Sequence, residues 1–204
     1  MSVSHYDWYL NNDNSPLPDL NLLNYPCWDD LELEKKKSLS KQFGLICWTY
    51  KTCECQTGID EEDSDCQLRY FFEKGFIVGC TKTNDKDYDS FSCYNVWTAG
   101  LLENHNHPDF QISCPSIPIF TANEILEILY ESIVEDKDEF HANDSVVLEI
   151  DDETLSITFV HASWLRKGDQ KVNGLRVIIC DRNKVLDKEI MEREYAIQFE
   201  NLYI

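Results

Sequence analysis

The sequence predicts an α+β fold in which antiparallel sheets of the meander type are covered on one face by two main helices. Runs of alternating apolar residues separated by short polar turns occur in both halves of the chain, and such runs are typical of antiparallel strands. Helix-start signals precede these runs near Asp29 and at Thr121. An apolar content of 43%, with 12% aromatic residues, indicates a packed core rather than a disordered chain.

The length of the chain bounds its organisation. A chain of 204 residues can bury a sizeable core without disulfides or metals. We therefore expect a single α+β domain over residues 1–204. A division into 1–115 and 116–204 is the alternative, because the order of a helix followed by strands occurs twice.

The first 44 residues predict an irregular arm and a helix. Residues 1–28 are rich in Asn, Asp, Pro and aromatic side chains, and we expect them to lie on the body of the protein. Asp29 or Asp30 can cap a helix that runs to about Phe43. Gly44 is placed to end that helix in the left-handed conformation.

A sheet is expected to follow this helix. Aromatic and β-branched residues separated by polar turns predict four strands. These strands cover residues 45–50, 67–72, 76–81 and 91–98. Asn and Pro residues interrupt both the helical and the strand period over residues 100–120, so we expect a long ordered loop there.

The second helix is expected to begin at Thr121. The stretch from Thr121 to Glu124 has the spacing of a capping box, in which the two side chains satisfy each other's backbone N–H groups. Apolar residues then recur at helical spacing. They are Ile125, Leu126, Leu129 and Ile133.

Alternating apolar residues after this helix predict a second set of strands. They cover residues 146–150, 155–160, 175–179 and 195–199. Their apolar faces need a cover, and the second helix is the nearest one in the chain. The predicted core therefore packs Ile125, Leu129 and Ile133 against Leu148, Ile150, Ile157, Phe159, Val177 and Ile179.

The charge of the chain limits its partners. With 18 basic and 38 acidic residues, the net charge is −20, which argues against direct binding to nucleic acid or to an anionic membrane. Residues 121–153 carry 12 acids against one lysine, or −11 of this charge. Such a segment fits a basic protein partner.

Seven acids of this segment form the candidate partner-binding set. Helical spacing places several of them on one side of the second helix. The set is Glu124, Glu127, Glu131, Glu135, Asp136, Asp138 and Glu139. Two interpretations stay open from the sequence, namely a solvated outer face and a contact surface for a basic protein.

The stretch His105-Asn106-His107-Pro108-Asp109 is the one candidate for metal chemistry, although no bound metal is expected. Two imidazoles and a carboxylate at alternating positions can converge on a divalent ion. These residues resemble the front of the His-x-His-x-Asp-His motif of metallo-β-lactamase-fold hydrolases. The resemblance covers five residues and implies a metal-dependent hydrolase that uses His105, His107 and Asp109, but Phe110 replaces the last histidine.

The nine cysteines have no repeating spacing. A zinc site built from Cys53, Cys55, Cys66 and Cys80 is one interpretation, and independent thiols are the other. The N-terminus lacks the features of a signal peptide, and no apolar run approaches the length that spans a bilayer. We therefore expect a cytoplasmic protein with reduced thiols and no membrane contact.

These observations predict an interaction protein rather than an enzyme. No Gly-x-Ser-x-Gly elbow, P-loop or Gly-x-Gly-x-x-Gly motif is present, and we expect no catalytic residue and no cofactor. The leading hypothesis is an acidic inhibitor of a basic partner such as a nuclease, a toxin or a nucleic-acid-binding protein, of the toxin-immunity or anti-defence type. The alternatives are the metal-dependent hydrolase and a structural subunit.

Overall fold

The structure of the chain is a computed structural model. It describes residues 17–43, 67–82, 94–113, 116–150, 153–166 and 170–200. These residues form two compact units that interleave along the chain, since each unit takes residues from before and after residue 100. The single-domain prediction, with its alternative boundary near residue 115, stays a prediction.

The first unit contains short helices. They are the 3-10 turns η2 (Leu22–Asn24) and η3 (Trp28–Asp30) and the α-helices α1 (Leu33–Phe43), α3 (Gln67–Lys74) and α4 (Leu101–His105). Helix α1 confirms the predicted first helix, although the turn η3 replaces its expected first residues. The side chain of Asn104 joins three segments of this unit, because its amide accepts from Leu22 N and donates to the carbonyls of Leu20 and Gly75.

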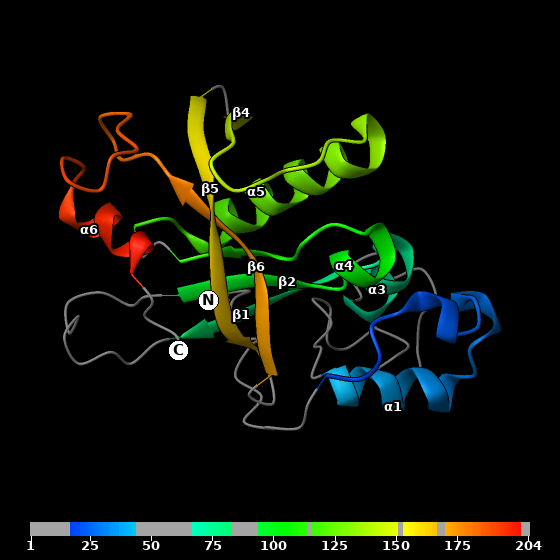
Figure 1. Ribbon diagram of the computed structural model, residues 1–204. Helices are drawn as coiled ribbons and strands as arrows, with labels where there is room; N and C mark the ends of the chain where they lie inside the picture. Colours follow the sequence, from blue (N-terminus) through cyan, green and yellow to red (C-terminus); the bar gives the residue numbers. More distant parts are fainter. Residues whose placement is uncertain are drawn as a thin grey trace, which may run out of the picture. The chain divides into compact units, whose positions relative to one another are not determined.

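The second unit is built on a six-stranded sheet with the order β1-β2-β3-β6-β5-β4 (Figure 1). Its strands are β1 (Ile77–Lys82), β2 (Tyr94–Ala99), β3 (Phe110–Ile112), β4 (Ser145–Ile150), β5 (Glu153–Arg166) and β6 (Gln170–Ile179). Strand β3 is antiparallel to β2 but parallel to β6. The α+β class is therefore confirmed, whereas the purely antiparallel meander is wrong.

The short strand β3 is the reason for this difference. It lies within residues 100–120, which the sequence predicted to be a loop, and it enters the sheet between β2 and β6. The two backbones approach closely there: Leu175 N donates to Asp109 O at 3.0 Å. A Cβ atom on Gly174 would stand 2.2 Å from the same carbonyl oxygen, so this contact requires glycine.

The predicted core is confirmed almost completely. Helix α5 (Ile119–Glu131) contacts β4, and Figure 1 shows it beside the β4–β5 end of the sheet. Of the nine predicted core residues, eight are buried and Ile150 is half-buried. The capping box is wrong, because α5 begins two residues before Thr121 and its N-cap, Pro118, makes no side-chain hydrogen bond.

The stretch 67–72, predicted as a strand, is the helix α3. Its buried residues Leu68 and Phe71 are spaced as on a helix, and Arg69 pairs with Glu73 one turn later at 2.7 Å. Gly75, at φ +80°, ends the helix by donating to Phe71 O. Aromatic content favoured a strand, but spacing and the terminal glycine favour the helix.

The last predicted strand, 195–199, is also helical. It forms α6 (Arg193–Ala196) and the 3-10 turn η7 (Ile197–Phe199). The fully buried Gln198 side chain accepts from Ile179 N at 2.8 Å and donates to Ile179 O at 2.6 Å. The Gln198 amide thus satisfies the backbone N–H and C=O groups of Ile179 at the end of β6, a role that the backbone of a neighbouring strand would otherwise fill.

Two further predictions concern the strand expected at residues 45–50 and the number of helices. The strand predicted at 45–50 lies outside the described residues. The described ranges contain α1, α3, α4, α5 and α6, which is more than the two main helices predicted. None of the helices in these ranges is long and apolar enough to cross a membrane.

Candidate acidic binding surface

The acidic residues after α5 lie on a π-helical turn and on the residues that follow it, rather than on a continued α-helix. The α-helix ends at Glu131, and a π-helical turn, η5 (Ser132–Asp136), follows it. Lys137 then adopts the left-handed conformation at φ +62°. Asp138 N donates to Ser132 O at 3.2 Å, and the Ser132 hydroxyl bonds the Asp138 carboxylate. Residues 131–139 are called the acidic segment below.

The seven predicted binding residues divide into two groups. Glu124 and Glu127 are half-buried on α5. The other five belong to the acidic segment and are exposed, namely Glu131, Glu135, Asp136, Asp138 and Glu139. Because the helix ends at Glu131, these five do not continue a single helical stripe. They are brought together by the turn instead.

A buried aromatic cluster anchors the C-terminal end of the acidic segment. The Phe140 ring is 8% exposed and stacks on Phe159 with a centroid distance of 5.1 Å. Phe110 and His107 complete the cluster. Phe140 N also donates to His107 Nε2 at 3.2 Å. The exposed acids are therefore displayed between α5 on one side and a fixed aromatic residue on the other.

Few positive charges oppose these acids. Lys137 lies within the segment, and its ammonium group donates to the carbonyl of Val134. In the described parts of the chain, none of the five exposed acids forms an ion pair with a lysine or arginine. Burial raises the pKa of the Tyr130 phenol, and the charges of Glu127 and Glu131 raise it further. The local field is therefore negative.

The three residues of the alternative metal site take separate partners. His105 Nε2 bonds Lys74 O at 2.7 Å and so helps to cap α3. His107 bonds Pro108 O through Nδ1 at 2.8 Å while its Nε2 accepts from Phe140 N, which fits the neutral tautomer protonated at Nδ1. Asp109 accepts from the Thr98 hydroxyl at 3.1 Å. Among the described residues, no group of three or more His, Cys, Asp or Glu side chains is placed to hold a metal ion.

The cysteines of the alternative zinc site are not described, since Cys53, Cys55 and Cys66 lie outside the described residues and only the backbone of Cys80 is seen, in β1. Cys27 is exposed and Cys180 is buried, and both are free thiols. We expect Cys27 to react with a thiol reagent in the native protein and Cys180 to react only after unfolding. Mass spectrometry of labelled peptides measures both rates, and equal rates would contradict the burial of Cys180.

Sequence reasoning missed a buried arginine on β6. Arg176 is 2% exposed although it stands within the apolar run of that strand. Its Nε donates to Gln111 Oε1 at 2.7 Å, and its Nη1 donates to the carbonyls of Gln198 and Glu200 at 3.1 and 2.6 Å. The guanidinium thus ties β3 and the C-terminal turns to β6. A charged residue inside an otherwise apolar strand was the available signal.

A second missed residue, Asp181, organises the loop after β6. Its carboxylate accepts from the backbone N–H groups of Asn183, Val185 and Glu192, each at 2.9 Å. Burial acts to raise the pKa of this carboxyl. The hydrogen bonds from the three N–H groups outweigh burial and hold the pKa below its usual range.

This arrangement predicts a pH dependence of stability. Because the folded-state pKa of Asp181 is depressed, its stabilisation is fully present above the pKa of the unfolded chain and is lost as pH falls through the folded pKa. Asp181→Asn should therefore lower the Tm at neutral pH, and this difference should shrink as the pH drops below the ordinary aspartate range. Calorimetric scans across acidic pH check it. A Tm difference that stays constant would contradict the role of the carboxylate charge.

In comparison with known proteins, no family model, no curated protein and no solved structure matches this chain. The class defined by the fold is thus a mixed α+β protein with a six-stranded mixed sheet.

Proposed function

We propose that this chain is a cytoplasmic inhibitor that binds a basic protein and covers its working surface. A nuclease or another nucleic-acid-binding protein is the partner that we favour, because its substrate site needs Lys and Arg to neutralise phosphates. The chain then acts as a nucleic-acid mimic, as toxin-immunity and anti-defence proteins do as a class. The net charge of −20 is the property that this chain would share with such proteins.

One observation carries the proposal: the acidic segment presents five exposed carboxylates without a lysine or arginine partner in the described structure. A surface acid that serves only for solubility needs no fixed position. These acids are positioned between the core helix α5 and the buried Phe140. Positioned charges lose less conformational entropy when a partner binds, so they favour specific binding.

The expected mechanism has two stages. The net charge of −20 attracts a basic partner over a distance and raises the rate of encounter. Carboxylates at the centre of the contact then pair with Arg or Lys of the partner and lose their water, which slows dissociation. Added salt should weaken the first stage, because the Debye length falls from about 10 Å at about 0.1 M to about 3 Å at about 1 M.

The test is a screen of purified basic nucleases for loss of DNA cleavage when the protein is added. For an inhibited nuclease, the double variant Glu135→Lys/Asp136→Lys should weaken binding by at least about tenfold, because it replaces attraction by repulsion. The fold should persist, since exposed substitutions usually change stability by no more than about 0.5 kcal/mol. Surface plasmon resonance gives both rate constants.

The matched control is Asp29→Lys/Glu189→Lys. It also replaces one Asp and one Glu, both exposed, and changes the net charge by the same amount, but at positions outside residues 131–139 of the sequence. Equal loss of binding in the two variants would mean that bulk charge alone attracts the partner. Failure to inhibit any basic nuclease or DNA-binding protein in the screen would contradict the proposal itself.

A further inference from the structure

Strand β4 forms one edge of the sheet. It is the last strand in the order β1-β2-β3-β6-β5-β4, and it pairs with β5 in antiparallel register from Ser145 opposite Thr158 to Ile150 opposite Glu153. Among the described residues, no strand pairs with its other side. An open edge is a template for a further strand.

The alternation of the hydrogen bonds between β4 and β5 shows which residues of β4 direct their backbone groups toward the open side. Just before β4, Asn143 lies at φ +75° and donates to Phe159 O at 2.7 Å, while Phe159 N donates to Asp144 O at 3.2 Å, as in a β-bulge. Bonds to β5 recur at every second residue in an antiparallel pair, so they continue from residues 146, 148 and 150. The N–H and C=O groups of Ser145, Val147 and Glu149 therefore point outward.

The side chains of the same three residues are accessible. Ser145, Val147 and Glu149 are exposed, and the Val147 side chain is 64% exposed. A strand that adds to β4 would cover this valine. The exposed side of the strand thus offers both backbone hydrogen-bonding groups and an apolar contact.

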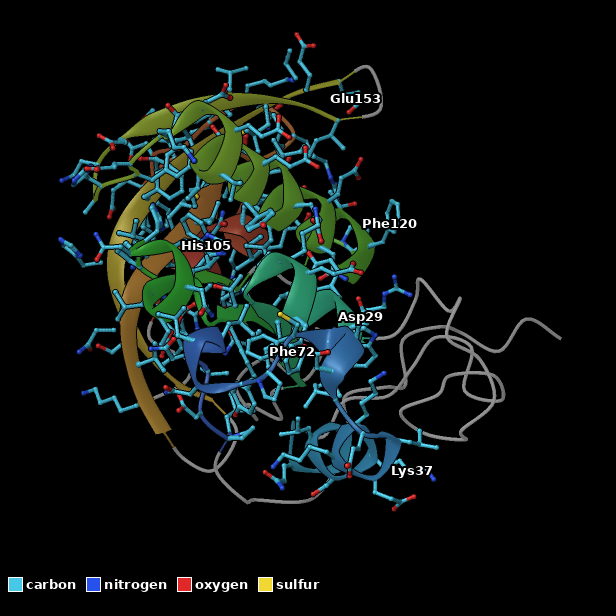
Figure 2. The ribbon with its side chains drawn as sticks, turned by 90° about the vertical axis from the view of Figure 1, so that its right-hand side faces the viewer. Asp29, Lys37, Phe72, His105, Phe120 and Glu153 are labelled. Atoms are coloured by element: carbon cyan, nitrogen blue, oxygen red, sulfur yellow. The ribbon has the colours of Figure 1, made fainter. Side chains whose placement is uncertain are left out.

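The charge around β4 selects the kind of strand. Exposed acids lie before it, within it and after it, at Asp144, Glu149 and Glu153. Figure 2 shows Glu153 at the tip of the β4–β5 hairpin. Lys184, which contacts this hairpin, donates to the carbonyl of Thr154. A second copy of the chain would bring like charges together, whereas a basic strand would pair with them.

We propose that β4 pairs with an extended, Lys- or Arg-bearing segment of the basic partner, which adds to the sheet as a seventh strand. This inference rests on the proposed function and names how the partner is held. Main-chain hydrogen bonds to the outward groups of β4 supply affinity, and the flanking acids supply selectivity for a cationic segment. The acidic segment precedes β4 in the chain, with residues 140–144 between them, and adds to the negative charge of the same unit.

The experiment uses a fluorescent peptide of about ten residues in which Lys alternates with Val and Thr, a length that covers a typical strand. A second peptide has the same sequence but carries N-methyl groups on alternate residues, so its charge is unchanged while one edge cannot donate hydrogen bonds. Fluorescence anisotropy with the wild-type protein should give a Kd about tenfold or more higher for the methylated peptide.

A matched pair of protein variants makes the reciprocal test. Val147→Pro removes an outward N–H group and should raise the Kd of the unmodified peptide by about tenfold. The hydrogen bonds between β4 and β5 should remain, because the N–H group of residue 147 does not take part in them. Val147→Thr keeps the N–H and should bind within about twofold of wild type. Circular dichroism checks that both variants fold, and the methylated peptide tests the proposal without any change to the protein.

The outcomes separate this inference from the proposed function. If binding is salt-sensitive but the two peptides have the same Kd, strand pairing is wrong, whereas the proposed acidic inhibitor is not contradicted. Absence of binding to either peptide would also overturn strand pairing by β4, whereas the nuclease screen decides the proposed function separately. Sedimentation gives a further result: dimers that are lost in Val147→Pro would assign the edge to a second copy of this chain and overturn the basic partner.

Discussion

Leu129→Ala is expected to lower the free energy of unfolding by about 2–5 kcal/mol, the range for a large-to-small change in a packed core. Leu129 is fully buried at 0% exposure on α5, with the buried Ile125 one turn before it on the same helix and the buried Ile133 on η5 after it. The neighbouring strands cannot collapse into the space left by the deleted carbons, so a cavity adds to the lost burial. Urea denaturation monitored by circular dichroism measures the change.

The control for this substitution is Leu102→Ala on α4. The same atoms are removed there, but Leu102 is 56% exposed. We expect a change of no more than about 0.5 kcal/mol, as for other exposed positions. A similar small change at Leu129 would mean that α5 does not cover the sheet.

Arg176→Met is expected to lower the free energy of unfolding by at least about 3 kcal/mol. Methionine approximates the length of the aliphatic stem but donates no hydrogen bond. The Gln111 Oε1 atom and the backbone carbonyls of Gln198 and Glu200 each lose a donor. The first two bonds are buried and the third is part-buried, and an unsatisfied buried acceptor costs about 1–3 kcal/mol, not strictly additively. Chemical denaturation measures the loss, and proteolysis of the C-terminal turns should become faster.

Arg193→Met is the control for the buried arginine. Arg193 is exposed at the start of α6, in the same unit, and its replacement should change stability by no more than about 0.5 kcal/mol. Equal effects of the two substitutions would show that the bonds from Arg176 contribute nothing beyond the general loss of a charge.

Leu129 and Arg176 belong to the same unit but act through different kinds of interaction. Leu129 acts through burial of apolar surface, which is not directional. Arg176 acts through directional bonds that hold β3, β6 and the C-terminal turns in one arrangement. The acidic segment depends on the first kind, because Phe140 and α5 anchor it, and loss of the core would release it.

The sequence by itself determined the elements whose apolar pattern is long and regular. Helix α5 and strand β4 were predicted with nearly their observed bounds, and eight of nine core residues are buried. Strands β5 and β6 were predicted at the right places but too short, since 155–160 and 175–179 are only parts of them. The period of an apolar pattern is a local property, so it can be recognised without knowledge of the fold. The excess of acids between α5 and β4 was equally evident from the sequence alone.

The tertiary structure alone decided the rest, because those features depend on residues far apart in the chain. Three residues are too few to show a strand period, so only the pairing of β3 with both β2 and β6 makes it a strand and the sheet mixed. The stretch 195–199 is helical where the buried Gln198 side chain bonds Ile179, a contact between residues far apart in the chain. The stretch 67–72 differs, because the spacing of Leu68 and Phe71 and the following Gly75 are local signals that the aromatic content had outweighed. The left-handed turn at Lys137, which gathers the acids on one turn, also breaks the helical spacing from which they were first predicted.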